Sequence, residues 1–333
     1  MKPIIIRNEP LSDVILERGS IIKADRYFEL DRRVLVLTDR DVPSEYVDVI
    51  CARCLYPVRV SVWPGDDVNS LDNYSRLCKA MLDNRFETGD CIVAVGGERV
   101  MELGGFLAAT YKGGIEYCCV PTTLKAQTGS GILGVSYLSL DAYKNALGAD
   151  SIPKRTLVDP EALDTLDEKR IANGYAEMIR LGLTLDSKLF EMLEREDMSS
   201  ERSFDKALNR SIEIRRYIYR NEKENRALRT IVNMGSLIAD SMEKTKFSYG
   251  ERLAIGMLPF CGPEVRARLR DLFTKFGLPV VWQYDAEKLF RDSIRNYESD
   301  RVTVARCDEV GASKADSLTV PEYHKLINAV YGG

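Results

Sequence analysis

The fold of this protein is decided by one stretch of its sequence, Val95-Gly96-Gly97-Glu98-Arg99-Val100-Met101-Glu102. The stretch follows an apolar run and opens a helical pattern, so it predicts a strand, a tight turn and a helix. Adjacent glycines let backbone amides approach a diphosphate, and the N-terminus of a helix adds positive potential there. A tight strand-to-helix turn also needs glycine for steric reasons, so the glycine pair alone leaves both interpretations open.

The first half of the chain alternates short β-rich runs with helical ones. We expect buried strands at Val34–Thr38, Pro57–Val62, Cys91–Val95 and Ile115–Val120. Helical spacing of apolar residues occurs between them, at Ser44–Cys54 and Ser70–Leu82. This alternation predicts an open parallel α/β sheet, that is, a Rossmann-like nucleotide-binding domain over residues 1–155.

The pattern becomes mainly helical after residue 155. Helices are predicted at Pro160–Leu185, Phe204–Tyr219, Leu237–Phe247 and Gly262–Phe276. The last of these ends where Gly277 and Pro279 follow. We therefore expect a mainly α-helical second domain over residues 156–333.

Composition excludes several classes of partner. The net charge is −4 and the sequence pI is about 5.5, which argues against nucleic acid or an anionic membrane as the main partner. No apolar run is long enough to span a bilayer, and the N-terminus MKPIIIRNEP lacks the features of a signal peptide. A cytoplasmic location is the expectation that follows.

The eight cysteines are expected to be free thiols. Cys51 and Cys54 form a CxxC, which could be a redox pair or half of a zinc site. Without a second CxxC or nearby histidines, two thiols one helical turn apart are the simpler interpretation. The chain contains a single histidine, His324, near its C-terminus.

Two further motifs carry groups that bind anions. Val120-Pro121-Thr122-Thr123-Leu124 places hydroxyls after a strand, where they could bind a ribose or phosphate or could cap a helix. Lys144-Asn145 offers a cation and an amide of the kind that binds a carboxylate or phosphate. For each motif taken alone, a purely structural role is the favoured explanation.

Together and in order, these motifs resemble the 3-dehydroquinate synthase family, the NAD- and zinc-dependent enzymes of the shikimate pathway. The resemblance runs along nearly the whole chain, through GGERVMELGGFLAATY (96–111), VPTTL (120–124), KNALG (144–148), LVDPEALDTL (157–166), GYAEMIR (174–180), LRTIVNMG (228–235) and YGERLAIGMLP (249–259). It implies a dehydroquinate synthase-like fold and a homodimer.

The zinc site that the resemblance implies is incomplete. The family holds zinc with a glutamate and two histidines, and the glutamate position is Glu177. The two histidine positions hold Ser236 and Tyr249, and a further active-site histidine position holds Asp240. Neutral serine and tyrosine are poor zinc ligands. His324 lies outside every matching motif, so we expect it at the surface and expect zinc to be absent.

The implied substrate positions are partly retained. Matching positions are Lys144, Asn145, Glu224, Arg229 and Asn233, and the lysine after the zinc glutamate becomes Arg180. Other family positions have changed: an aspartate and a lysine fall on Gly129 and Val135, an arginine falls on Gly113, and a lysine pair falls near Tyr297 and Glu298.

The implied NAD site is also altered. The retained positions are Asp39, Gly96, Gly97, Thr122 and Thr123, while Glu102 is a milder change from aspartate. The third glycine of the turn is Glu98, and a compensating lysine becomes Asn69. Like charges within ~5 Å repel by at least about 1 kcal/mol, so NAD binding is expected to be possible but weakened.

The sequence supports three hypotheses. The first is a catalytically degenerate homologue that keeps the fold, and that self-associates or pairs with an intact paralogous synthase. The second is a repurposed lyase, in which Glu177, Asp240 and Tyr249 bind Mg²⁺ or Mn²⁺ and act on a polyhydroxylated anionic substrate. The third is a sensor of small molecules that uses the old site.

Overall fold

The computed structural model describes residues 4–8, 11–65, 67–129, 132, 134–140, 143–279, 285–295 and 299–332. Tyr297 and Glu298 lie outside these residues. The chain forms two compact units, Met1–Leu166 and Asp167–Gly333. The sequence placed this change near residue 155. The first unit extends further because β9 (Arg155–Val158) still pairs with its sheet.

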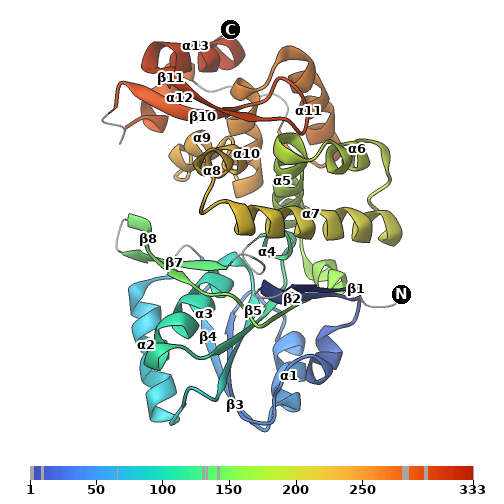
Figure 1. Ribbon diagram of the computed structural model, residues 1–333, viewed down its shortest axis with the longest axis vertical. Helices are drawn as coiled ribbons and strands as arrows, with labels where there is room; N and C mark the ends of the chain where they lie inside the picture. The colour runs from blue at the N-terminus through green and yellow to red at the C-terminus, as the bar shows by residue number, and fades with distance from the viewer. Residues whose placement is uncertain are drawn as a thin grey trace. The chain divides into compact units, whose positions relative to one another are not determined.

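The first unit is built on a seven-stranded sheet with the order β1-β2-β9-β6-β5-β3-β4. Figure 1 labels β1 to β5 of this sheet. Its other strands are β1 (Ile4–Asn8), β2 (Leu11–Leu16), β3 (Arg33–Asp39), β4 (Tyr56–Val62), β5 (Cys91–Gly96) and β6 (Glu116–Pro121). The pairs from β2 to β4 are parallel, and β1 is antiparallel to β2. The predicted parallel α/β sheet is confirmed.

Strand β4 is an exception to the predicted burial. Its residues are exposed or half-buried except for Val62, and Tyr56 is 59% exposed. The prediction of a buried strand was wrong here because β4 lies at the edge of the sheet, where it pairs only with β3. By contrast β5, which lies between β6 and β3 inside the sheet, is buried at every position.

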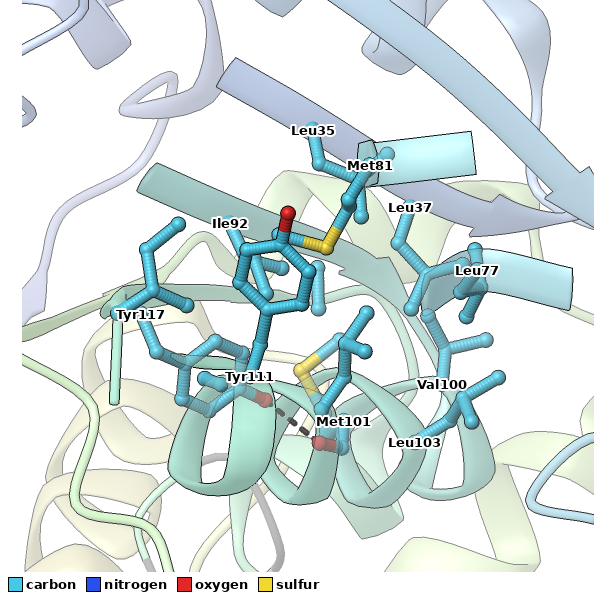
Figure 2. Close-up of a cluster of buried hydrophobic side chains, with 14 of the residues drawn as sticks. Leu35, Leu37, Leu77, Met81, Ile92, Val100, Met101, Leu103, Tyr111 and Tyr117 are labelled. Atoms are coloured by element: carbon cyan, nitrogen blue, oxygen red, sulfur yellow. Dashed lines mark hydrogen bonds between the residues drawn. The ribbon is translucent and has the colours of Figure 1, made fainter. Parts of the chain in front are cut away.

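Each face of the sheet has its own apolar core. One core packs residues of α2 (Leu71–Asp83) and α3 (Glu98–Thr110) against the strands. Figure 2 shows this cluster, in which the hydroxyl of Tyr117 donates to the carbonyl of Met101 at 2.6 Å. The other core joins α1 (Ser44–Arg53) and η1 (Ile21–Arg26) to the opposite face. Helices on both faces of a parallel sheet leave the strand ends open for sites.

A hairpin that the sequence did not predict packs against α3. It consists of β7 (Val135–Leu140) and β8 (Tyr143–Asp150). Gly105 of α3 permits this contact, because a Cβ there would collide with the hydroxyl groups of Ser136 and Ser151. The unit also contains η2 (Tyr111–Gly113), α4 (Leu124–Gln127) and η3 (Pro160–Thr165).

The second unit is mainly helical, as predicted. Its helices are α5 (Glu168–Leu185), α6 (Ser187–Arg195), α7 (Glu201–Asn221), α8 (Arg226–Val232), α9 (Ser236–Ser241), α10 (Tyr249–Met257), η4 (Leu258–Phe260), α11 (Pro263–Lys275), α12 (Ala286–Ser293) and α13 (Val320–Tyr331). The hairpin of β10 (Arg301–Arg306) and β11 (Lys314–Thr319) was not predicted.

Two helix predictions differ from the structure. The predicted helix Pro160–Leu185 is divided into η3 and α5, because Asp167 caps α5 by accepting a hydrogen bond from the amide of Arg170 at 2.7 Å. The predicted helix Leu237–Phe247 is shorter, since α9 ends at Ser241. Among the described residues, no helix has both the length and the apolar character that crossing a membrane requires.

Candidate functional site

Glu177 lies at the centre of a buried polar cluster in the second unit. Helix α5 carries it into the interior, where it is 2% exposed. The Nη2 atom of Arg180, one turn further along α5, donates to both carboxylate oxygens at 2.9 and 2.7 Å. The Nη2 atom of Arg215, on α7, donates to Oε2 at 2.6 Å. The hydroxyl of Tyr249, at the start of α10, donates to Oε1.

The cluster places two guanidinium cations around one carboxylate. Arg180 and Arg215 are 5% and 6% exposed, so little water screens these contacts. Charge-assisted hydrogen bonds of this kind are among the strongest in proteins. Removing one member of a buried ion pair leaves the partner's charge uncompensated and costs about 3–5 kcal/mol. Both oxygens of Glu177 are therefore held firmly by groups of the chain itself.

The residues at the histidine positions belong to the same cluster. Ser236 accepts a 3.0 Å hydrogen bond from Nη1 of Arg180. Tyr249 follows Ser248, which forms a capping box with Glu251 at the start of α10. The structure thus brings Glu177, Arg180, Ser236 and Tyr249 together, while Asp240, near the end of α9, is exposed.

A zinc ion does not fit this arrangement. It would have to take Glu177 away from two buried arginines and then lie beside their positive charges. Ser236 and Tyr249 supply only hydroxyl groups, and zinc prefers imidazole, thiolate and carboxylate. Among the described residues, only Cys91, Glu116 and Cys118 form a group of three or more histidine, cysteine or acidic side chains close enough to share a metal ion. Glu177 and Asp240 form no part of that group.

Arg215 is the member of the cluster that the sequence prediction missed. It lies on the buried side of α7, beside Arg216, which is 5% exposed. The available signal was two adjacent arginines between Ile214 and Ile218, at positions where the helical spacing of apolar residues places the buried face. Buried arginine normally needs an anionic partner, and in this unit the partner is Glu177.

His324 lies away from this cluster, as the sequence predicted, although it is not simply a surface residue. On α13, its Nε2 atom lies 2.6 Å from Oε2 of Glu287 and 3.0 Å from Nδ2 of Asn328. Its ring centroid lies 4.2 Å from that of Phe290. These contacts assign His324 to the packing of α13 against α12.

The retained substrate-type positions are exposed. In the second unit, Glu224, Arg229 and Asn233 lie in and around α8, and the side-chain amide of Asn233 donates to the carbonyl of Arg229 at 2.9 Å. In the first unit, Lys144 and Asn145 lie on β8, where Asn145 has a φ of +52°. The remaining changed positions are Gly113 in η2, Gly129 just after α4, and Val135 at the start of β7.

The glycine turn of the first unit has the predicted strand–turn–helix form. Gly96 ends β5, and a Cβ there would come within 2.9 Å of Cγ2 of Val100, so packing alone requires glycine. Thr123 caps α4 by accepting from the amide of Ala126 at 3.2 Å. The amide of Thr122 donates to the carbonyl of Gly96 at 2.9 Å. Asp39, at the end of β3, accepts from the amide of Asp41 at 2.8 Å.

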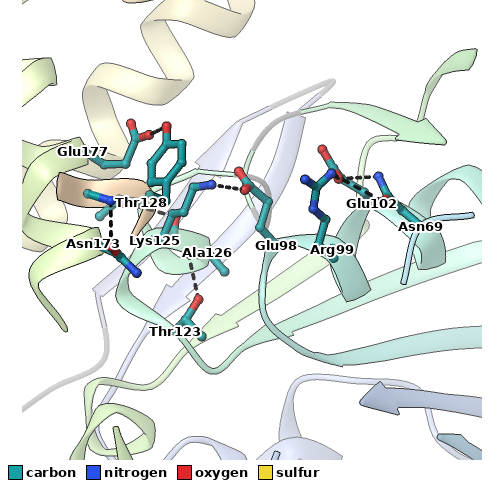
Figure 3. Close-up of polar contacts among 12 residues, drawn as sticks. Asn69, Glu98, Arg99, Glu102, Thr123, Lys125, Ala126, Thr128, Asn173 and Glu177 are labelled. Carbon is teal, nitrogen blue, oxygen red and sulfur yellow. Dashed lines mark hydrogen bonds and ion pairs between the residues drawn. The ribbon is translucent and has the colours of Figure 1, made fainter. Parts of the chain in front are cut away.

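Glu98 does not face this turn as an uncompensated charge. Its carboxylate forms an ion pair with Lys125 of α4, as Figure 3 shows. The motif pattern pointed to the carboxylate but not to Lys125, which directly follows the PTTL motif. The ion pair offsets the repulsion expected between Glu98 and a diphosphate.

Glu102 is buried one turn further along α3. Its Oε2 accepts a 2.8 Å hydrogen bond from Nδ2 of Asn69 and lies 3.7 Å from Nη1 of Arg99 (Figure 3). Burial, together with the nearby charge of Glu98, raises the pKa of Glu102 to about 8. Asn69 is thus a neutral hydrogen-bond donor to this carboxyl group.

The CxxC has no contacts of a redox site. The thiol of Cys54 donates to the carbonyl of Ile50 at 3.2 Å. Burial raises the pKa of Cys54 to about 12 and raises that of Cys51 as well. Since the thiolate is the reactive form, both thiols are held in their inert form. All eight cysteines are free.

Comparison with protein families gives one consistent match. The model of the 3-dehydroquinate synthase N-terminal part matches residues 59–173, and that of the C-terminal part matches residues 174–297. The chain is 28% identical to a 3-dehydroquinate synthase of Clostridium beijerinckii over 312 residues, which are 88% of this chain and 87% of that protein. It is 25% identical to that of Sulfurimonas denitrificans over 280 residues, covering 79% and 80%.

Solved structures share the fold. A 2-epi-5-epi-valiolone synthase from Streptomyces hygroscopicus, with NAD⁺ and Zn²⁺ bound, superimposes with a TM-score of 0.85 at 20% identity over 98% of both chains. A 2-deoxy-scyllo-inosose synthase, complexed with carbaglucose-6-phosphate, NAD⁺ and Co²⁺, gives 0.87 at 16% identity over 99% of this chain and 100% of that one. The expected dehydroquinate synthase-like fold is confirmed.

Proposed function

Because the chain belongs to the 3-dehydroquinate synthase family, we propose that it is a degenerate member of that family, which binds no zinc at Glu177 and is inactive in forming 3-dehydroquinate. The family's catalysis depends on a bound metal and on NAD. The observation that carries the proposal is the engagement of Glu177 by Arg180, Arg215 and Tyr249. A carboxylate already held by two buried cations is not available to a metal ion.

The nucleotide turn supports the same proposal. A dinucleotide phosphate at the N-terminus of α3 would have to compete with Glu98 for Lys125. It would also approach the carboxyl group of Glu102, which ionises at higher pH. NAD binding is therefore weakened, although the glycine turn after β5 and the hydroxyl groups of Thr122 and Thr123 remain.

The repurposed lyase is the alternative that the geometry favours less. Its proposed ligands were Glu177, Asp240 and Tyr249. Tyr249 uses its hydroxyl proton to hydrogen-bond Glu177, and both oxygens of Glu177 are bonded to arginine. A divalent ion would have to displace these contacts before it gained any, so Mg²⁺ and Mn²⁺ meet the same obstacle as zinc.

An activity assay with a matched positive control tests the proposal. We expect no formation of 3-dehydroquinate above background with NAD and Zn²⁺ in excess, under conditions in which the Clostridium beijerinckii relative is active. The protein should be confirmed as folded by circular dichroism in the same buffer. Turnover that depends on added metal and is lost in Glu177→Gln would contradict the proposal.

The role of such a protein would be to bind another protein chain. We propose self-association, or pairing with an intact paralogous synthase, because β7 and β8 expose apolar side chains, including Tyr143 at 73% and Leu147 at 37%. Light scattering of the purified protein tests the first form. Co-expression with a tagged synthase tests the second. A monomer at all concentrations that retains no synthase would contradict both.

A further inference from the structure

Two thiols and a carboxylate meet at the opposite end of the sheet from the glycine turn. Cys91 is the first residue of β5, and Glu116 is the first residue of β6 and lies directly opposite it in the register. Cys118 follows two residues later, so its side chain lies on the same face as that of Glu116. Gly96 is the last residue of β5, at the opposite end of the strand from Cys91, so this cluster is separate from the glycine turn.

The donor atoms have the spacing of a metal site. One sulfur from each cysteine and one carboxylate oxygen all lie within 4.8 Å of one another. Ligand atoms around a tetrahedral zinc with bonds of ~2.3 Å to sulfur lie about 3.8 Å apart, so small side-chain adjustments would close the site. A disulfide fits less well, because Cys118 lies opposite Val93 and meets Cys91 only diagonally.

The charges around the cluster suit a divalent ion. Two thiolates and a carboxylate carry three negative charges, one more than Zn²⁺ neutralises. Arg32 supplies the remaining positive charge. It is paired with Glu116, and two carbonyls hold it in place: Nη1 donates to Gly89 and Nε donates to Glu29, both at 3.0 Å.

One carboxylate oxygen of Glu116 can bind a metal ion with little loss of interaction energy. Lys154 donates to Oε2 of Glu116 at 2.7 Å and also to Oε1 of Glu29 at 2.9 Å. Because its side chain is 40% exposed and keeps Glu29 as a partner, Lys154 can release Glu116 without losing its ion pair. The thiols themselves are each 1% exposed, which protects a bound ion from solvent.

We propose that Cys91, Cys118 and Glu116 form a binding site for a thiophilic divalent cation such as Zn²⁺, with Arg32 as the balancing charge. The site is independent of the proposed function, since it uses neither Glu177 nor the glycine turn. A zinc ion bound there would link β5 to β6. It would take no part in the chemistry of the family.

Cobalt titration of the intact, reduced protein tests the site. We expect one Co²⁺ per chain with thiolate-to-cobalt charge-transfer absorption. Binding should strengthen with rising pH, because cysteine binds a metal ion as the thiolate and must release its proton to do so. Cys91→Ser and Cys118→Ser should abolish the absorption, and Glu116→Gln should weaken binding at least tenfold. Cys51→Ser and Glu191→Gln should leave the absorption unchanged, because neither residue belongs to the cluster.

X-ray absorption of the unmodified protein loaded with zinc gives a second readout if a serine variant fails to fold. Two sulfur ligands at ~2.3 Å are expected. A shell of oxygen and nitrogen alone, or charge-transfer absorption that survives in both folded serine variants, would overturn the proposal. If the metal has no sulfur ligand and its binding is lost in Glu177→Gln, the proposed function is contradicted as well. Failure of the thiol site alone can therefore be distinguished from failure of both proposals.

Discussion

Arg215 on α7 donates a 2.6 Å hydrogen bond to Oε2 of Glu177 on α5. This bond ties two long helices of the second unit together through buried charges. Arg180 and Arg215 together give this carboxylate two cationic partners. Their two positive charges equal the charge that a divalent metal ion would bring. Glu177 then acts as an internal structural anchor.

Replacing Glu177 with glutamine should strongly destabilise the second unit. The change keeps the size of the side chain and leaves two buried guanidinium groups without a full countercharge, so we expect a loss of about 3–5 kcal/mol in the free energy of unfolding. Glu191→Gln makes the same substitution in an exposed pair with Arg195 and should cost less than about 0.5 kcal/mol. Urea unfolding measures both. Equal effects would show that the cluster is not the anchor.

Rising pH should destabilise the first unit through Glu102. The folded-state pKa is raised from 4.5 to about 8, so the folded protein binds the proton more tightly than the unfolded chain. The stabilising contribution is fully present below about pH 4.5 and is lost as the pH rises towards 8, by up to about 1.4 kcal/mol per pH unit.

Glu102→Gln isolates this contribution. The variant should remove most of the slope of stability against pH between 5 and 8, estimated at about 1.4 kcal/mol per unit. Asp83→Asn, at the exposed end of α2, serves as the control and should keep the slope. Thermal unfolding across the pH range measures both, and a Glu102→Gln curve parallel to that of the unmodified protein would refute the assignment.

Removing the carboxylate of Glu98 should strengthen NAD binding. Glu98→Gly releases Lys125 for the phosphates and restores a third glycine to the turn, so we expect affinity to rise about tenfold, equivalent to ~1.4 kcal/mol. Lys125→Ala should instead lower any affinity that is present. Fluorescence titration with NADH checks both variants. An affinity that is unchanged in Glu98→Gly would mean that the ion pair does not limit NAD binding.

The sequence predicted the centre of the fold better than its edges. Strands β3, β5 and β6 were predicted within one residue or so because their continuous apolar runs are buried on both faces. The apolar run of β4 looks similar, but this strand lies at the edge of the sheet and is only partly buried. Which strand lies at the edge depends on the order of the strands, and the sequence of a single strand does not contain that information. The hairpin of β7 and β8 was missed for a similar reason, since its strands are stabilised by each other and by α3.

Site prediction from sequence found the altered positions and missed their new partners. Glu177, Ser236 and Tyr249 could be placed from motif order alone. Arg215 and Lys125 could not, because the first comes from a different helix and the second meets Glu98 only after β5 and β6 pair. Motif positions show what has been lost, whereas compensating charges become visible only in three dimensions.

Zinc titration of Cys118→Ser by calorimetry tests the central claim most directly. This variant removes the proposed thiol site and leaves the cluster around Glu177 intact, so any remaining zinc must bind elsewhere. We predict no saturable zinc binding at micromolar concentrations, with or without NAD. If Cys118→Ser binds one zinc ion per chain and the double variant that also carries Glu177→Gln binds none, the claim that Arg180 and Arg215 have taken the place of the metal is contradicted.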